Sequence, residues 1–106
     1  MAVIALEKPE WLNIVGQYLE KIATIFGERI IKILVAPHPD DLVYNANIII
    51  VVKKLEDKDF DKALETARKL EKTMNLDITI LPYVVEKDSI VELEAEGKWY
   101  ENEQNT

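Results

Sequence analysis

Few residue types in this chain can do chemistry, and most of them lie in one short stretch. Cysteine is absent, and serine and histidine occur once each, as Ser89 and His38. These counts exclude disulfides, thiolate nucleophiles and Cys-ligated zinc, and they leave no persuasive Ser-His-Asp arrangement. The three glycines stand far apart, so there is no glycine-rich phosphate loop. The remaining candidates are the carboxylates and amides Asp40, Asp41, Asn45, Asn47 and Asp77.

A long helix is expected upstream of these candidates, from residue 9 to 26. Pro9 is suited to a first helical turn, and Gly27 is a natural terminator. Between them, apolar residues recur at helical spacing. They are Trp11, Leu12, Val15, Tyr18, Leu19, Ile22, Ile25 and Phe26. We expect Trp11, Tyr18 and Phe26, with Phe60 of a later helix, to be core residues.

Two strands are expected on either side of a loop. Residues 29–36 are rich in β-branched side chains and predict a strand. The sequence Pro37-His38-Pro39-Asp40-Asp41 cannot continue it and predicts a loop or tight turn. A second strand is expected over residues 47–53. Its five consecutive apolar residues, 48–52, indicate burial on both faces, as in a central strand.

A second helix and a third strand are expected next. Asp57 or Asp59 can cap the helix, and Asn75 can end it. Its apolar stripe consists of Phe60, Ala63, Leu64, Ala67, Leu70 and Met74. Residues 76–85 predict the third strand, in which Pro82 must lie at an edge, a bulge or an end, because proline cannot donate to a ladder.

The C-terminal segment predicts a short helix followed by an aromatic pair. Asp88 or Ser89 can cap the helix, and Gly97 ends it. Trp99 and Tyr100 then form either a short return strand or an aromatic plug on the core. The predicted order is α-β-β-α-β-α, an α/β (α+β) fold with a small mixed sheet packed against helices. Strands two and three flank a candidate for a right-handed crossover. We expect one domain over residues 1–100 and a frayed polar tail at 101–106.

This layout resembles the minimal nucleotidyltransferase domain of the DNA polymerase beta-like superfamily, from residue 11 to 100. Residues 25–34 look like the entry helix and first strand of that family. Asn45-Ala46-Asn47, with the apolar run after it, looks like the segment that carries the family's Asp-x-Asp. Leu76-Asp77-Ile78-Thr79 is similar to the strand with the third acid, and residues 94–100 are similar to the closing segment. The resemblance implies a nucleotidyltransferase-like fold, with Mg²⁺ and a nucleoside triphosphate as family ligands.

The catalytic motif of the family is altered here. In the family, Gly-Ser follows the first strand, and two aspartates on one strand face hold two magnesium ions about 4 Å apart. Ala36 and Pro37 occupy the Gly-Ser place, and Pro37 has no N–H to offer a phosphate. Asn45 and Asn47 replace the two aspartates and offer neutral oxygens, where magnesium prefers carboxylates. Only Asp77 keeps an acid at a family position, so the resemblance implies the fold and argues against family catalysis.

A rebuilt site is the alternative. His38, Asp40 and Asp41 lie on the loop that would face the family's pocket, where Ala36, Pro37 and His38 would adjoin a cofactor. With Asp77, the loop acids can form a displaced metal or phosphate-proximal cluster. The competing interpretation is a solvated turn, since Pro-Asp-Asp is common in turns for backbone reasons.

The composition restricts partners and location. The chain has 13 basic and 20 acidic residues and a formal net charge of −7, which disfavours non-specific binding to DNA. Seven acids and two lysines lie within residues 86–106, as a solvated face or as a docking face for a basic partner. There is neither a signal-peptide pattern nor an apolar run of the ~20 residues that a membrane helix needs. We therefore expect a cytoplasmic protein, and the abundance of Ile, Lys and Glu without cysteine is typical of a thermophile.

Three functions are compatible with these features. The first is a degenerate nucleotidyltransferase-fold protein that binds a partner or a nucleotide. The resemblance implies a small helical HEPN-type protein as the partner class, with this chain as the antitoxin half of a toxin–antitoxin module. The second is an active nucleotidyltransferase that transfers NMP from NTP with a metal site at Asp40, Asp41 and Asp77. The third is a structural module that pairs with itself through a sheet edge.

Overall fold

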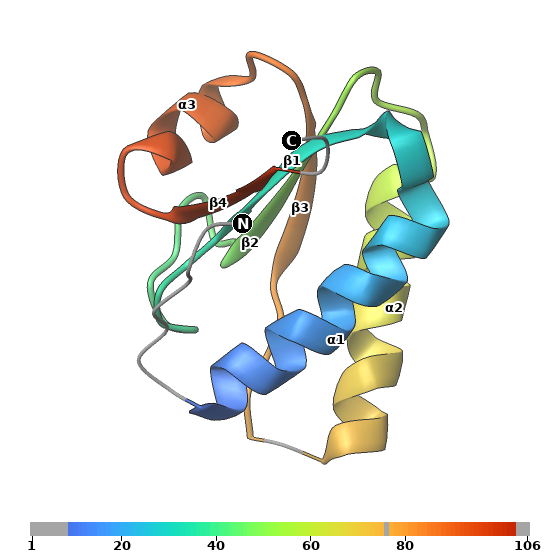
Figure 1. Cartoon of the computed structure of the whole chain (residues 1–106), viewed down its shortest axis with the longest axis vertical. Coiled ribbons are helices and arrows are strands. Elements are labelled where there is room, and N and C mark those ends of the chain that lie inside the picture. The colour runs from blue at the N-terminus through green and yellow to red at the C-terminus, as the bar shows by residue number, and fades with distance from the viewer. Residues whose placement is uncertain (1–8, 76, 104–106) are drawn as a thin grey trace.

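The structure, a computed structural model, describes residues 9–75 and 77–103. Four strands form one mixed sheet with helices on both of its faces (Figure 1). The strand order is β3-β2-β1-β4. β1 pairs antiparallel with β2 and with β4, and β2 pairs parallel with β3. The strands are β1 (Ile30–Val35), β2 (Ile48–Val52), β3 (Pro82–Glu86) and β4 (Tyr100–Glu103).

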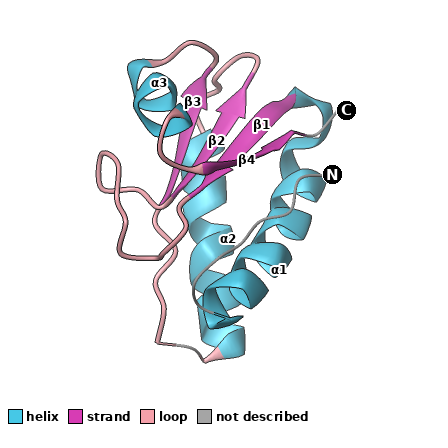
Figure 2. Ribbon diagram, turned by 60° about the vertical axis from the view of Figure 1, so that its left-hand side comes forward, coloured by secondary structure: helices cyan, strands magenta, loops and turns pink. Residues whose placement is uncertain are grey.

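The helices form two layers of unequal size. The long helices α1 and α2 lie together on one face of the sheet, and the short helix α3 lies on the other (Figures 1 and 2). This arrangement confirms the predicted order α-β-β-α-β-α of a mixed α/β fold, with β4 added after it. The helices are α1 (Pro9–Phe26), α2 (Asp59–Met74) and α3 (Ile90–Glu96), and a 3₁₀ turn η1 (Gly27–Arg29) joins α1 to β1.

The larger core lies between the sheet and the two long helices. Trp11, Tyr18 and Phe26 of α1 are buried in it, as predicted. The Tyr18 hydroxyl donates to the carbonyl oxygen of Ala63 at 2.8 Å and so links α1 to α2. Burial raises the pKa of Tyr18 above its ordinary value. The indole Nε1 of Trp11 donates to the carbonyl oxygen of Ala36 at 2.7 Å and links α1 to the end of β1.

The central strand and several helix ends are confirmed. Every residue of β2 is buried, as expected for a strand between two others with helices on both faces. Gly27 follows α1 with φ of 56°, and Asn75 ends α2 with φ of 53°, so both take the left-handed conformation of helix C-termini. Ser89 caps α3, because its Oγ accepts from the N–H of Val91 at 3.2 Å.

Two expectations about element ends are wrong. The third strand begins at Pro82 rather than at residue 76, because side chains occupy the backbone groups of Ile80 before it. Ile80 N–H donates to Glu71 of α2 at 2.5 Å, and its carbonyl accepts from Arg68 at 2.6 Å. Neither Asp57 nor Asp59 caps α2; Lys58 precedes the helix without a side-chain cap.

The C-terminal segment combines both predicted alternatives. Trp99 is buried against α3 as an aromatic plug, and Tyr100 begins a return strand. Glu101–Glu103 were expected to fray, but their backbone belongs to β4 and pairs with β1. Polar composition alone did not reveal that β1 offers them an open edge. The rest of the expected tail, residues 104–106, lies outside the described residues.

Candidate functional site

Asn47 is a buried side chain whose amide is hydrogen-bonded to two neighbouring segments. Its Nδ2 donates to the carbonyl oxygens of Pro39 and Thr79, at 3.0 Å each. Its Oδ1 accepts from the N–H of Leu81 at 2.8 Å. Asn47 is 0% exposed. These three bonds, which we call the Asn47 clip, tie the loop before β2 and the segment before β3 to the start of the central strand.

The clip gives a structural reason for an amide at this position. An amide can donate twice and accept at the same time, whereas a carboxylate has no N–H and can only accept. Pro39 and Thr79 present carbonyl oxygens, which need donors, and Leu81 presents an N–H, which needs an acceptor. The Oδ1 atom of Asn47 is therefore directed at the backbone of its own chain rather than at an open site.

Asn45 lies in a tight turn and not on β2. The N–H of Val43 donates to the carbonyl of Ala46 at 2.9 Å, and the N–H of Ala46 donates back at 3.0 Å. Tyr44 and Asn45 between them have φ of 51° and 62°, as in the type I′ turn of a two-residue hairpin. Asn45 is exposed. Asn45 and Asn47 thus do not share one face of a strand, unlike the two aspartates of the family motif.

Two of the candidate acids line the same shallow depression. Asp40 and Asp77 are both exposed and face a hollow of about 270 Å³, which we call the acidic hollow. The Asn47 clip fixes part of its lining, because Thr79 and Leu81 belong to both. The acidic hollow is lined by Pro39, Asp40, Leu42, Asp77, Ile78, Thr79 and Leu81.

The remaining candidates lie on the loop after β1. Ala36 N–H donates to the carbonyl of Asn47 at 3.0 Å, and the Ala36 carbonyl accepts from Trp11, so both backbone groups are engaged within the fold. His38 is half-buried after Pro37. Its Nδ1 accepts from the N–H of Asp40 at 3.2 Å and lies 3.7 Å from the Asp40 carboxylate. The N–H of Asp41 donates to the carbonyl of His38 at 3.0 Å.

These contacts are those of a hydrogen-bonded loop. Asp41 is exposed and is not among the residues of the acidic hollow. Within residues 9–75 and 77–103, no three acidic or histidine side chains are grouped closely enough to hold a metal ion. The four residues predicted to gather are therefore brought together only in part: Asp40 contacts His38 and shares a hollow with Asp77.

A second hollow next to the acidic one was not predicted from the sequence. It has a volume of about 240 Å³ and exposes three aromatic side chains, Tyr44, Phe60 and Tyr83. Phe60 was expected in the core but is 40% exposed. Its ring packs edge-on against Tyr83, with the ring centroids 6.0 Å apart. This aromatic hollow is lined by Tyr44, Asn45, Ala46, Phe60, Leu64, Leu81, Pro82 and Tyr83.

Tyr44 has the left-handed backbone conformation that its turn requires, which is unfavourable for a tyrosine. A left-handed φ costs a residue other than glycine, asparagine or aspartate roughly 1 kcal/mol. Asparagine adopts this conformation readily and favours this turn type. We therefore expect Tyr44→Asn to leave the fold intact and to stabilise it by about 0.5–1 kcal/mol. Urea denaturation measures this change, and a destabilisation beyond 1 kcal/mol would show that the Tyr44 ring contributes to the fold.

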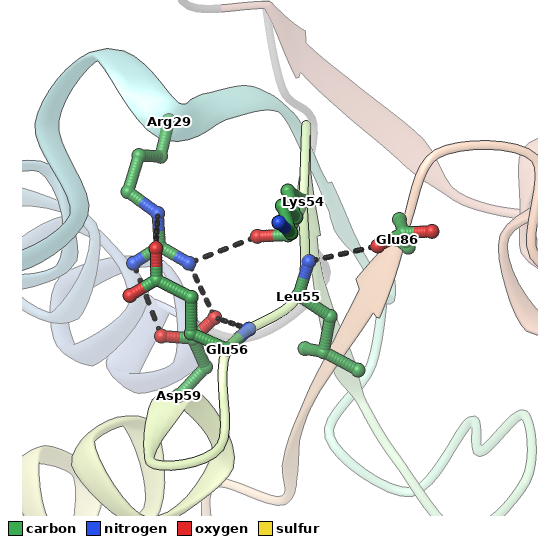
Figure 3. Close-up of polar contacts among 6 residues, drawn as sticks. All are labelled: Arg29, Lys54, Leu55, Glu56, Asp59 and Glu86. Atoms are coloured by element: carbon green, nitrogen blue, oxygen red, sulfur yellow. Dashed lines mark hydrogen bonds and ion pairs between the residues drawn. The ribbon is translucent and has the colours of Figure 1, made fainter.

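A second polar cluster closes the opposite end of the sheet (Figure 3). The guanidinium of Arg29 donates to both carboxylate oxygens of Asp59, at 3.1 and 2.5 Å, and to the carbonyl of Lys54 at 3.0 Å. Asp59 also accepts from the N–H of Glu56 at 2.8 Å. Nearby, the N–H of Leu55 donates to the carboxylate of Glu86 at 2.9 Å. We call the Arg29 and Asp59 pair, with these backbone partners, the Arg29 clamp.

The Arg29 clamp connects three junctions of the fold. Arg29 precedes β1, Lys54 follows β2, and Asp59 begins α2. Burial on its own would raise the pKa of Asp59, but the hydrogen bonds from Arg29 and Glu56 and the positive charge of Arg29 hold that pKa below its ordinary value. The same contact with Asp59 raises the pKa of Arg29. Because Asp59 is 1% exposed and fully paired, this cluster is a structural tie and not a site.

Two acids of the C-terminal region are also used within the fold. The Nζ of Lys32 on β1 lies 3.1 Å from the carboxylate of Glu92 and also contacts Glu96. Glu92 is buried and accepts from the N–H of Asp88 at 2.6 Å. These contacts attach α3 to the sheet. The acidic excess of residues 86–106 is therefore partly internal.

Comparison of the chain with protein-family models, with curated proteins and with solved structures finds no match. The chain is a mixed α/β protein in which the Asn47 clip lies next to two hollows. In the part of the chain that the structure describes, no helix is long and apolar enough to cross a membrane.

Proposed function

We propose that this protein is a catalytically degenerate nucleotidyltransferase-fold protein that acts as a partner-binding module. The observation that carries the proposal is the Asn47 clip. At the position where the resemblance puts a metal-binding aspartate, the side chain is 0% exposed and bonded to three backbone groups. Asn45 lies in a turn and not next to Asn47 on the same face of a strand. Asn47, at a position that helps to hold magnesium in the family, thus ties backbone segments together in this chain.

The surface supports the partner-binding part of the proposal. Tyr44, Phe60 and Tyr83 line one hollow, and they are 56%, 40% and 40% exposed. Exposed apolar groups that gather on one face are typical of interaction sites. By the resemblance, we propose a small helical HEPN-type protein as the partner, with this chain in an antitoxin-like role in the cytoplasm. Co-purification with the product of a neighbouring HEPN gene, and failure to co-purify with an unrelated helical protein of similar size, is the expected result.

Calorimetric titration with ATP, with and without Mg²⁺, tests whether a nucleotide site remains. We expect no magnesium-dependent heat at millimolar ATP, because Ala36 and Asn47 already use the polar groups that would bind the triphosphate and metal. The Asp77→Ala variant should behave like the wild type. Magnesium-dependent binding that weakens in Asp77→Ala would contradict the proposal and support catalysis.

The alternative function is an active nucleotidyltransferase with a relocated metal site. One observation favours it, since Asp40 and Asp77 line the same hollow. Two carboxylates across a depression can bind a hydrated Mg²⁺ ion, which keeps several waters when few protein ligands are available. This function requires transfer of labelled nucleotide to a protein or nucleic-acid acceptor, lost in Asp77→Ala and retained in Asp57→Ala. No transfer with Mg²⁺ or Mn²⁺ across several acceptors excludes it.

A further inference from the structure

The acidic and aromatic hollows are neighbours on the surface. Leu81 lines both of them, so they meet at its side chain. The Asn47 clip holds Leu81 through its N–H and thereby fixes the floor at this junction. We call the two adjoining hollows together the groove; it has carboxylates at one end and aromatic rings at the other.

The aromatic end of the groove presents apolar surface to solvent. Tyr44 is 56% exposed, and Phe60 and Tyr83 are 40% exposed each. The edge-to-face contact between Phe60 and Tyr83 fixes these two rings without burying them. Tyr44 projects from a turn in which its backbone is strained, with φ of 51°. Strained backbone conformations cluster at functional sites. An asparagine would suit this turn better, but it would not supply the aromatic ring that Tyr44 gives to the hollow.

The acidic end of the groove selects the charge of its ligand. Asp40 and Asp77 are exposed, and among the described residues that line the two hollows there is neither a lysine nor an arginine. The whole chain carries a formal charge of −7. This end therefore repels phosphates and carboxylates and attracts a guanidinium or ammonium group. The charge of the groove is therefore complementary to a basic segment. The negative charge of the whole chain also favours a basic partner.

We propose that the groove binds an extended segment of a partner protein that carries a Lys or Arg beside an apolar or aromatic anchor. The cation contacts Asp40 and Asp77, and the anchor packs among Tyr44, Phe60 and Tyr83. Alternate side chains of an extended chain point the same way about 7 Å apart, so one short segment can occupy two adjoining hollows. This inference rests on the partner-binding function and names the surface and the chemistry of the segment bound.

Selection from a random peptide library displayed on phage tests the inference without knowledge of the natural partner. We expect enriched peptides that place Lys or Arg within a few residues of an aromatic or large apolar residue. A synthetic copy of an enriched peptide, measured by fluorescence anisotropy, should bind Tyr44→Asn and Asp77→Asn at least tenfold more weakly than wild type. Tyr44→Asn is a clean variant because we expect it to stabilise the fold. Binding should also weaken as salt is added.

Two matched controls distinguish binding in the groove from non-specific binding to exposed acidic or apolar residues. Asp61→Asn removes an exposed acid from α2, and Ile90→Asn removes an exposed apolar residue from α3. Both variants should bind the peptide as wild type does. The inference is overturned if no peptide is enriched, if the enriched peptides are acidic, or if they bind the Tyr44→Asn and Asp77→Asn double variant as tightly as wild type.

The natural partner, once captured, distinguishes this inference from the proposed function. Loss of the partner in the Tyr44→Asn and Asp77→Asn double variant supports the groove. Retention of the partner in that variant, with loss in Ile90→Asn, keeps the partner-binding function and overturns the groove as its surface.

Discussion

The Asn47→Asp variant is expected to lose about 3–5 kcal/mol of folding free energy, although it restores an aspartate to the family position. The carboxylate can still accept from Leu81 N–H, but it cannot donate to Pro39 and Thr79. The carbonyl oxygen of Pro39, in a buried bond, and that of Thr79, in a partly buried one, then lose their donors and face a negative charge instead. Each unsatisfied buried acceptor costs about 1–3 kcal/mol, and the buried charge adds to this. Urea denaturation followed by circular dichroism measures the loss.

The loss should depend on pH in a defined direction. Burial beside two carbonyl oxygens raises the folded-state pKa of an aspartate at position 47 above its unfolded value of about 3.9. The folded state therefore binds more protons than the unfolded state between these two pKa values, and stability falls as pH rises through that window. We expect Asn47→Asp to be closest to wild type near pH 4 and to reach its full deficit at neutral pH.

Asn45→Asp is the matched control. Asn45 is exposed, and aspartate tolerates the left-handed conformation of this turn. Its stability should change by less than about 0.5 kcal/mol. If Asn47→Asp is as stable as wild type, the clip does not explain the asparagine. If the double variant Asn45→Asp, Asn47→Asp transfers nucleotide with Mg²⁺, the site is two substitutions from activity, and our interpretation of Asn47 is wrong.

The regular elements could be predicted because their causes are local. The apolar spacing from Trp11 to Phe26 and the glycine after it define α1 without any knowledge of the rest of the chain. The apolar run of β2 predicts burial on both faces for the same reason. The expected start of the third strand at residue 76 failed because Glu71 and Arg68 of α2 occupy the backbone groups of Ile80. Periodicity does not report such side-chain contacts.

The candidate site could be predicted only in part. Asp40 and Asp77 were singled out for their chemistry, and they line one hollow. The role of Asn47 was not visible, because its partners lie 8, 32 and 34 residues away. Phe60 was assigned to the core because it fits the apolar stripe of α2, but it is 40% exposed, and its ring meets Tyr83 at the surface. The aromatic hollow draws on separate segments of the chain and leaves no local pattern.

Asp59→Ala is expected to lose about 3 kcal/mol, which corresponds to a fall of roughly 10–15 °C in Tm for a domain of this size. Asp59 is 1% exposed and accepts from Arg29 twice and from Glu56 N–H once. Its removal leaves the N–H of Glu56 without its acceptor and leaves Arg29 with the carbonyl of Lys54 and the more distant carboxylate of Glu56, at 3.6 Å. Partial exposure of Arg29, at 29% of its side chain, keeps the cost at the lower end for a broken buried pair. Thermal and urea unfolding at neutral pH measure both quantities.

Acid should remove the difference between wild type and Asp59→Ala. Because the folded-state pKa of Asp59 lies below its ordinary value, its contribution is fully present above the unfolded pKa of about 3.9 and is lost as pH falls through the folded pKa. We therefore expect the gap in unfolding free energy to be constant from about pH 8 to 5 and to shrink below about pH 4. A difference in unfolding free energy that stays constant down to pH 2 would show that Asp59 stabilises the fold through packing and not through its charge.

Glu65→Ala is the control on the same helix. Glu65 pairs with Lys69 at 2.9 Å, but both side chains are largely exposed. An exposed pair of this kind contributes about 0.3–0.5 kcal/mol, so this variant should unfold close to wild type. If Asp59→Ala also costs less than 1 kcal/mol, the junctions between β1, β2 and α2 are held by apolar packing alone. The larger expected cost follows from position, since Asp59 is buried where three junctions meet and Glu65 lies on a solvated face.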